Sequence, residues 1–347
     1  MSKTDMSAYG LHGQYEMPNG EYKIGRILSQ EKGLYFMISE NGGRLAEVSG
    51  KFRYNAESAV DFPSVGDFVL ADCGGGENYA VIHAVLPRKS VFVRKAAGGD
   101  NTEQIVAANI DTVFICMSLN NDFNVRRLER YLSAVWESGA VPVIVLTKSD
   151  LCADLAEFKN KVEEIAFGTD IITTSAKEED SIKKLLPYIG FGKTAALTGS
   201  SGVGKSTLIN ALLGENRLET NGLRNDDKGR HTTTRRELFL LKNGGMVIDT
   251  PGMRELGMWD SEDGIGKSFS DIEELSAMCR FSDCTHTSEP GCAVLKAVTD
   301  GALSRERLLS YQKLKAENAY FENTDEYLSA KKRKFKNIAK INKDRRI

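Results

Sequence analysis

The sequence has no long hydrophobic run and few cysteines. Its longest strongly apolar stretch, Val141 to Leu146, is far too short to cross a bilayer, and the first twenty residues contain no apolar signal segment. Six cysteines in 347 residues are too few and too unevenly spaced for a disulfide scaffold. These absences exclude a membrane-spanning protein and a disulfide-rich secreted one. We therefore expect a cytoplasmic protein with no membrane partner.

The overall charge is nearly balanced, but its distribution is not. The chain has a net charge of −2, with 41% hydrophobic and 27% charged residues, which is typical of globular protein in two or three domains. Residues 331–347 hold nine Lys or Arg against one Asp, a net charge of +8. Such a tail is either a solvated helix end or an arm that contacts nucleic-acid phosphates, and we favour RNA contact.

A glycine-rich loop between an apolar strand and an amphipathic helix has the form G-x-x-x-x-G-K-S. In such a loop the backbone N–H groups and the helix N-terminus surround phosphate oxygens, the lysine reaches the β and γ phosphates, and the serine hydroxyl binds Mg²⁺. The pattern predicts a nucleotide-binding protein. The residues that we expect to bind the nucleotide are Gly199, Ser200, Ser201, Gly202, Val203, Gly204, Lys205, Ser206 and Thr207.

A second phosphate-site motif, Asp249-Thr250-Pro251-Gly252, follows the apolar strand at 246–248. Alone it is most often a turn, but after a phosphate loop it is the expected partner. We expect Asp249 to hold Mg²⁺ together with Ser206, and the Gly252 N–H to meet the γ phosphate. Lys205 and Asp249 are therefore candidate catalytic residues.

Two further motifs follow predicted strands and suit guanine. Thr147-Lys148-Ser149-Asp150 places a carboxylate that can accept from both N1–H and the 2-amino group of guanine, a donor pair that adenine lacks. The segment resembles the guanine-reading N-K-x-D motif of GTPases, with Thr147 in place of Asn, and a hydroxyl contacts the purine less fully than an amide. The second motif, Ser175-Ala176-Lys177, resembles the S-A-K motif of GTPases, which packs against the base. An ATPase with a misread base motif is the alternative.

The segments around these motifs predict two kinds of domain. Short runs of strand character separated by glycine-rich turns suit a small closed barrel, of which the OB-fold is a common nucleic-acid platform. The expected barrel strands are Tyr22–Leu28, Leu34–Ile38, Arg44–Val48, Phe68–Ala71 and Tyr79–Val85. From residue 109 onward, apolar strands alternate with helical patterns, as in a parallel sheet. Residues 1–20 are polar and aperiodic, and we interpret them as a flexible leader.

A cluster of three cysteines and one histidine lies within fourteen residues near the C-terminus. Its spacing is Cys279-x4-Cys284-x-His286-x5-Cys292. Three thiolates and an imidazole are the ligand set of a closed tetrahedral zinc site, and no acid or base nearby points to a catalytic one. We expect one structural Zn²⁺ in addition to the Mg²⁺ that accompanies nucleotide.

The order of the motifs resembles that of circularly permuted GTPases, because the base motifs precede the phosphate loop. With a barrel before and a Cys/His cluster behind, the chain resembles the small-ribosomal-subunit-dependent GTPase A (RsgA/YjeQ) family over nearly its whole length. The segment 229–234 (GRHTTT) also agrees. The predicted domains are a leader (1–20), an OB-fold barrel (21–97), a circularly permuted α/β P-loop GTPase domain (98–262) and a helical zinc-binding domain with the basic tail (263–347).

The resemblance implies a monomeric GTPase that binds the small (30S) ribosomal subunit and its rRNA and acts in late maturation of that subunit. It implies that His231 orients the attacking water, although a surface histidine in a flexible loop is the alternative. One of Thr232, Thr233 and Thr234 is expected to complete the Mg²⁺ shell in the GTP state. The competing hypothesis is a nucleotide-gated RNA-binding protein or chaperone in which hydrolysis is incidental.

Overall fold

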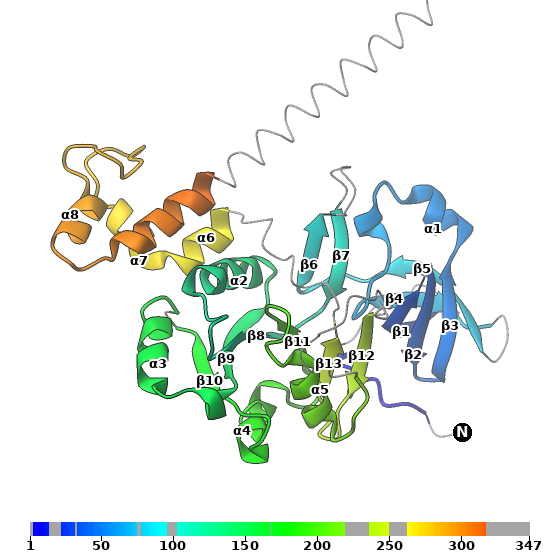
Figure 1. Cartoon of the computed structure of the whole chain (residues 1–347). Coiled ribbons are helices and arrows are strands. Elements are labelled where there is room, and N and C mark those ends of the chain that lie inside the picture. The colour runs from blue at the N-terminus through cyan, green and yellow to red at the C-terminus, as the bar shows by residue number, and fades with distance from the viewer. Residues whose placement is uncertain are drawn as a thin grey trace, which may run out of the picture. The chain divides into compact units, whose positions relative to one another are not determined.

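The computed structural model describes residues 3–13, 22–31, 33–74, 78–95, 103–166, 168–218, 236–249 and 262–316. The chain divides into two compact units, residues 1–258 and 259–347. The first contains a β-barrel and a parallel sheet, and the second is helical (Figure 1). Among the helices in the described ranges, none is long and apolar enough to span a membrane.

The N-terminal strands form a closed five-stranded barrel. Its strand order is β1–β2–β3–β5–β4, and β1 closes the ring by pairing with β4 as well as β2. A short helix, α1 (Gly50–Asn55), joins β3 to β4, and the Ser49 hydroxyl caps it by accepting from the Phe52 N–H. Each predicted strand falls within an observed one, and the OB-fold class is confirmed. The strands are β1 (Tyr22–Glu31), β2 (Leu34–Ser39), β3 (Gly42–Val48), β4 (Phe68–Asp72) and β5 (Tyr79–Val85).

The central domain is a doubly covered sheet of order β10–β9–β8–β11–β13–β12. All its pairings are parallel except that of β12 with β13. The expected α/β class is therefore confirmed. The strands are β8 (Thr112–Ser118), β9 (Val141–Thr147), β10 (Asp170–Thr173), β11 (Thr194–Thr198), β12 (Arg236–Leu240) and β13 (Met246–Asp249), and the helices are α2 (Val125–Glu137), α3 (Leu155–Glu163), α4 (Glu179–Lys183) and α5 (Lys205–Leu213).

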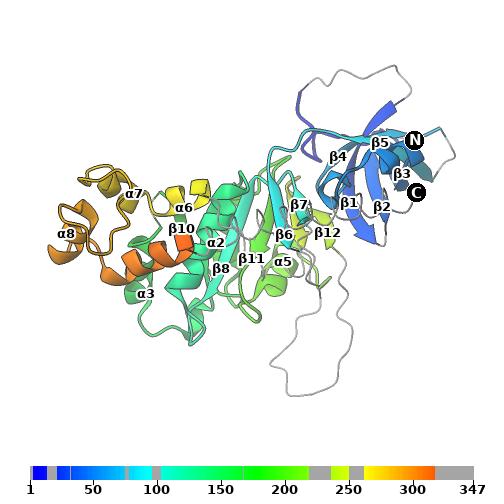
Figure 2. The same ribbon diagram turned by 90° about the horizontal axis from the view of Figure 1, so that it is seen from above.

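Alternate residues of β8 point into two separate cores. Ile115 and Met117 pack with α2 and α3, whereas Phe114 and Cys116 pack with α4 and α5. The face of α2 predicted from the helical period, Leu128, Tyr131, Leu132 and Val135, is buried. Figures 1 and 2 both place α2 beside β8. Burial on both faces explains why the strands are continuous apolar runs.

The strands of the barrel and of the parallel sheet together form one continuous hydrogen-bonded sheet of eleven strands. The link is the antiparallel pairing of β1 with β12, in which Ser29 lies opposite Glu237. A separate hairpin, β6 (Val91–Lys95) and β7 (Glu103–Ala108), connects the two parts along the chain. The predicted boundary between residues 97 and 98 falls between these two strands.

Arg26 of β1 lies at the junction and is 1% exposed. Its guanidinium donates to the carbonyls of Tyr9, Gly66 and Asn109 at 2.5, 3.2 and 3.2 Å. It also donates to Thr194 Oγ1 at 2.8 Å. Burial lowers the pKa of Arg26 to about 10. One charged side chain thus joins the leader, the barrel, the residue that follows β7 and the first residue of β11.

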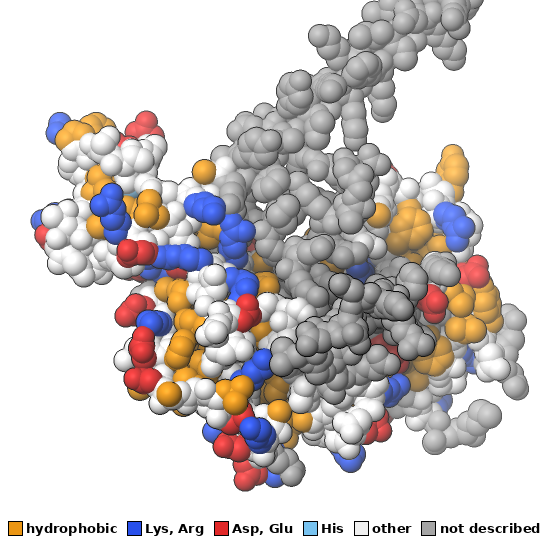
Figure 3. Space-filling model, viewed as in Figure 1, with side chains coloured by type: hydrophobic (Ala, Val, Ile, Leu, Met, Phe, Trp, Pro, Cys, Tyr) orange, Lys and Arg blue, Asp and Glu red, His pale blue; other side chains and the backbone are white. Residues whose placement is uncertain are grey.

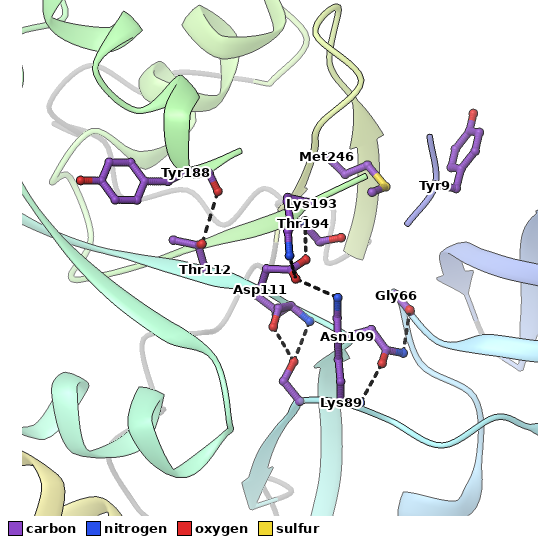
Figure 4. Close-up of polar contacts among 12 residues, drawn as sticks. Tyr9, Gly66, Lys89, Asn109, Asp111, Thr112, Tyr188, Lys193, Thr194 and Met246 are labelled. Atoms are coloured by element: carbon purple, nitrogen blue, oxygen red, sulfur yellow. Dashed lines mark hydrogen bonds and ion pairs between the residues drawn. The ribbon is translucent and has the colours of Figure 1, made fainter. Parts of the chain in front are cut away.

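A second set of polar contacts at the same junction surrounds Asp111 (Figure 4). Asp111 accepts from Lys89 Nζ at 2.8 Å, from Lys193 Nζ at 3.2 Å and from the Thr194 N–H at 2.8 Å. Residues 3–13 of the predicted leader also make contacts, because Tyr9 binds Arg26 and the Thr4 N–H donates to the Glu40 carbonyl. This part of the leader therefore has defined partners within the unit, which its polar, aperiodic sequence did not predict.

The second unit consists of α6 (Glu262–Ser268), α7 (Ser270–Ser276), α8 (Ala293–Thr299) and a further helix over residues 305–316. Its core contains Ile265, Phe269, Ile272 and Val294, all fully buried. Arg307 makes a bidentate ion pair with Asp271, in which both N–O distances are 2.7 Å. The predicted C-terminal basic segment, 331–347, lies outside the described residues.

Candidate functional site

The glycine-rich loop lies between β11 and α5, at the carboxyl edge of the parallel sheet. Gly199, Gly202 and Gly204 have φ values of 137°, 76° and 102°, which other residues rarely adopt. A Cβ on Gly199 would also lie 2.3 Å from the Cys116 carbonyl oxygen. Both backbone conformation and space therefore require glycine at the start of the loop. The predicted residues from Gly199 to Thr207 form this loop and the first turn of α5.

Lys205 lies over this loop. Its ammonium donates to the carbonyl oxygens of Gly199 and Ser200, both at 2.7 Å. The first turn of α5 carries Lys205, Ser206 and Thr207, all partly exposed. An ammonium, a hydroxyl pair and a helix N-terminus thus converge on one loop, an arrangement suited to phosphate.

The first base motif reaches this loop through Thr147, the last residue of β9. Its hydroxyl donates to the Val203 carbonyl at 2.7 Å, and the residue is 4% exposed. The hydroxyl of Thr147, a residue predicted to contact the purine, thus also links β9 to the phosphate loop. The next residue, Lys148, adopts the left-handed conformation with φ 59°, and Ser149 donates from its N–H to the Thr174 carbonyl.

Asp150 is held in place by the second base motif. Ser175 Oγ donates to Asp150 Oδ1 at 2.9 Å, and Lys177 Nζ lies 2.8 Å from Oδ2. These two groups, Lys177 first, hold the pKa of the Asp150 carboxyl below its usual range. Ser175 is fully buried, and Ala176 and Lys177 are exposed beside it. The structure therefore brings both predicted base motifs together and orients one ionised carboxylate.

Asp249 lies at the carboxyl end of β13, and two strands, β11 and β8, separate β13 from β9 in the sheet. Burial raises the pKa of Asp249, the Lys205 charge opposes that rise, and Glu237, its register partner on β12, adds to it. Because β13 pairs with β11, the strand that leads into the phosphate loop, Asp249 lies at the same edge of the sheet as that loop. The other predicted residues, His231, Thr233, Thr234 and Gly252, lie outside the described residues.

The four predicted metal ligands, Cys279, Cys284, His286 and Cys292, form one cluster. Their donor atoms all lie within 4.8 Å of one another. His286 Nδ1 is 3.4 Å from Cys292 Sγ and 3.7 Å from Cys279 Sγ. Three thiols and an imidazole nitrogen therefore face a common point, as a tetrahedral site requires.

A hydrogen bond on the side of the His286 ring away from the thiols explains the orientation of the ring. Ser276 Oγ donates to the Ile272 carbonyl at 2.7 Å and lies 3.0 Å from His286 Nε2. Because the serine proton is already used, the hydroxyl oxygen is free to accept from Nε2–H, which leaves the Nδ1 lone pair toward the thiols. The cluster is consistent with a structural zinc site.

One face of the barrel carries exposed apolar side chains. Phe36 on β2 lies opposite Leu45 on β3, and Leu45 lies opposite Tyr79 on β5. They are 36%, 45% and 37% exposed, respectively. Hydrophobic side chains gather over these strands in Figure 3. This row forms an exposed apolar surface on the barrel.

Sequence comparison identifies the protein family. Residues 85–259 match the family described as RsgA GTPase. The chain belongs to the RsgA GTPase family. It is 52% identical over 303 residues to small ribosomal subunit biogenesis GTPase RsgA 2 of Lactiplantibacillus plantarum, covering 87% of this chain and 85% of that relative. It is 45% identical over 328 residues to RsgA 1 of Oceanobacillus iheyensis, covering 93% of both.

Solved structures agree with this assignment. YjeQ from Thermotoga maritima is 28% identical, with a TM-score of 0.64 over 86% of this chain and 99% of that one. YloQ, described as a circularly permuted GTPase, is 26% identical, with a TM-score of 0.63 over 88% and 98%. The predicted RsgA/YjeQ family and its permuted GTPase fold are therefore confirmed.

One side chain at the site of this RsgA family member was not predicted from the sequence. Asp122, in the loop after β8, accepts a hydrogen bond from the Ser200 hydroxyl. An acidic residue after a predicted parallel strand was the available signal, since the carboxyl ends of such strands share the edge on which ligands bind. Its contact with the phosphate loop depends on the pairing of β8 with β11.

Proposed function

We propose that this GTPase acts in late maturation of the small (30S) ribosomal subunit, where it binds the subunit and hydrolyses GTP to GDP and phosphate. The observation that carries the proposal is the convergence of the phosphate loop, Asp150 and Asp249 on one edge of the parallel sheet. The names of the relatives from Lactiplantibacillus plantarum and Oceanobacillus iheyensis support the ribosomal part of the proposal.

The nucleotide is bound at its two ends by different parts of the chain. The loop and helix residues from Gly199 to Thr207 hold the phosphates, and Asp150, oriented by Ser175 and Lys177, reads guanine. Lys148 covers the base. Ser206 and Asp249 are the residues that hold Mg²⁺, which offsets phosphate charge when bound. Gly252 and one of the threonines at 232–234 complete the γ-phosphate and Mg²⁺ contacts.

Hydrolysis requires a positioned water, for which His231 is the proposed residue. The side chain after the DTPG motif is Met253, which cannot orient water through a hydrogen bond, so unstimulated turnover is expected to be slow. Binding to the subunit would place His231 beside the γ phosphate. The enzyme then acts as a switch whose turnover reports that its partner is bound.

RNA contact is assigned to the barrel and to the basic segment 331–347. The row Phe36, Leu45 and Tyr79 offers an exposed apolar face on which bases can stack, and the tail offers nine positive charges. Cys279, Cys284, His286 and Cys292 would bind one structural Zn²⁺. A monomer in the cytoplasm, where ribosomes mature, fits this role.

The test is steady-state GTP hydrolysis with and without purified small subunits, at low and moderate salt, with large subunits as the control. Acceleration by small subunits alone, weakened by salt, supports the proposal, and His231→Ala should then abolish the acceleration while leaving GTP binding intact. Bound nucleotide without acceleration would indicate an RNA-binding module or chaperone with incidental hydrolysis. Competition by ATP as effective as that by GTP would contradict guanine recognition.

A further inference from the structure

The loop between β8 and α2, residues 119–124, contacts the phosphate loop through one carboxylate. Ser200 Oγ donates a hydrogen bond to Asp122 Oδ2. These residues are 78 positions apart in the chain. The contact joins the end of a neighbouring strand to the second residue of the G-x-x-x-x-G-K-S loop.

Asp122 is itself held from several sides. Arg127 Nη2, in the first turn of α2, lies 3.0 Å from Asp122 Oδ2 and also donates to the Asp122 main-chain carbonyl. The Asp122 N–H donates to Asn120 Oδ1 at 3.0 Å. Asn120 Oδ1 accepts in turn from the Ser118 hydroxyl at 2.8 Å. These contacts hold the Asp122 carboxylate in place independently of its hydrogen bond with Ser200.

A negative charge beside a phosphate-binding loop opposes the binding of phosphate unless it is balanced. Arg127 supplies the balancing charge at Asp122 Oδ2, the same oxygen that accepts from Ser200. Ser200 is also the residue whose carbonyl accepts from Lys205 Nζ at 2.7 Å. The side chain and the main chain of one residue thus connect Asp122 to the phosphate-binding lysine.

We propose that Asp122 is a positioning residue for nucleotide binding, which holds Ser200 so that the phosphate loop and Lys205 are preorganised. This inference rests on the proposed binding of GTP phosphates by this loop. Because Asp122 acts on the loop and not on the base, its loss should weaken GTP and GDP to a similar degree and leave guanine selectivity unchanged. A hydrogen bond to a charged acceptor makes a loss of about tenfold in affinity the expected size.

The experiment measures the dissociation constants of fluorescent GDP and of a non-hydrolysable GTP analogue in the full-length protein. The variants are Asp122→Ala, Ser200→Ala and the double variant. If the contact is responsible, each single variant loses about tenfold in affinity and the double variant loses no more than either single one. Asp122→Asn, which keeps an acceptor oxygen but loses the charge, should lose less than Asp122→Ala.

The matched control is Asp154→Ala. Asp154 lies in the loop after β9, where its carboxylate caps α3 by accepting from the Glu157 N–H at 3.0 Å. This variant should bind nucleotide like the wild type. Equal losses in Asp154→Ala and Asp122→Ala would indicate general destabilisation and overturn the proposal.

Two further results separate the proposal from the function on which it rests. In the first, the wild type binds guanine nucleotide, but the Asp122 and Ser200 variants lose no affinity or lose it additively. That result would overturn the positioning role and leave the GTPase assignment intact. Failure of the wild type to bind guanine nucleotide would overturn both. Should Asp122→Ala fail to fold, Ser200→Ala, which removes one oxygen atom, tests the contact alone, and unchanged affinity in that variant would overturn the proposal.

Discussion

The hydroxyl of Thr147 donates a 2.7 Å hydrogen bond to the main-chain carbonyl of Val203. Thr147 begins the base motif at the end of β9, and Val203 lies in the phosphate loop after β11. Both residues are almost completely buried. The two halves of the candidate nucleotide site are therefore bonded to each other within the protein, independently of any contact that each makes with a ligand.

Thr147→Val is expected to weaken GTP and GDP binding equally, by about fivefold. The change preserves the side-chain shape but leaves the buried Val203 carbonyl without this donor, and a net hydrogen bond contributes about 1 kcal/mol. Thr147→Ser, which keeps the hydroxyl, is the control and should lose less. Titration with fluorescent nucleotides measures both. A change in the preference for guanine over adenine, with phosphate affinity unchanged, would instead indicate that Thr147 reads the base.

Asp150→Asn is expected to shift binding from guanine toward xanthine nucleotides. The carboxylate accepts from two donors of guanine, whereas an amide also presents a donor, which suits the additional carbonyl of xanthine. Competition between GTP and xanthosine triphosphate measures the shift. Unchanged GTP selectivity in Asp150→Asn would remove this residue from base recognition.

The ion pair between Lys177 and Asp150 predicts a pH effect. Lys177 and Ser175 hold the pKa of Asp150 below its usual range, so the carboxylate stays ionised, and guanine affinity persists, at pH values where an ordinary Asp would begin to protonate. Lys177→Met raises that pKa toward the usual value, so affinity should begin to fall at higher pH as the solution is acidified. Near neutral pH the effect should be small, because Lys177 is 74% exposed. Dissociation constants measured from pH 7 to pH 4 check this, with Lys183→Met, paired to a different acid, as the control.

Loss of metal is expected to unfold the second unit. Zinc is predicted at one ion per chain, and Cys292→Ser should reduce it to near zero. Since metal binding supplies folding free energy to such small segments, chelation should also lower helicity and expose residues 262–316 to protease. Cys152→Ser, outside the cluster, is the control. Zinc content well below one per chain, with stability unaffected by chelator, would contradict the zinc assignment.

Arg26→Met is expected to destabilise the first unit by about 3 kcal/mol, because several buried acceptors lose their donor together. These acceptors include Thr194 Oγ1 and the carbonyls of Gly66 and Asn109. Arg53→Met removes an exposed guanidinium from α1 and should change stability by less than about 0.5 kcal/mol. Urea unfolding of both variants measures the difference, and equal stabilities would show that Arg26 is not a structural link.

Local patterns were enough to predict much of the fold. Alternation and turn residues predicted all five barrel strands, and the helical period predicted the buried face of α2. The Gly199-to-Ser206 spacing predicted the loop, since it reflects a backbone conformation that neighbouring residues dictate. The Cys/His spacing likewise predicted a cluster that lies within one short segment.

Contacts between distant segments were decided only by the tertiary structure. Nothing in the residues around Arg26 indicates that it is buried, because its acceptors come from segments up to 220 positions away. The pairing of β1 with β12 and the bond from Ser200 to Asp122 depend in the same way on strands that are far apart in the chain. By itself the sequence determined the motifs, the barrel strands and the family. The fold decided which motif side chains bond to one another, because hydrogen bonds between remote residues form only after the sheet has set their register.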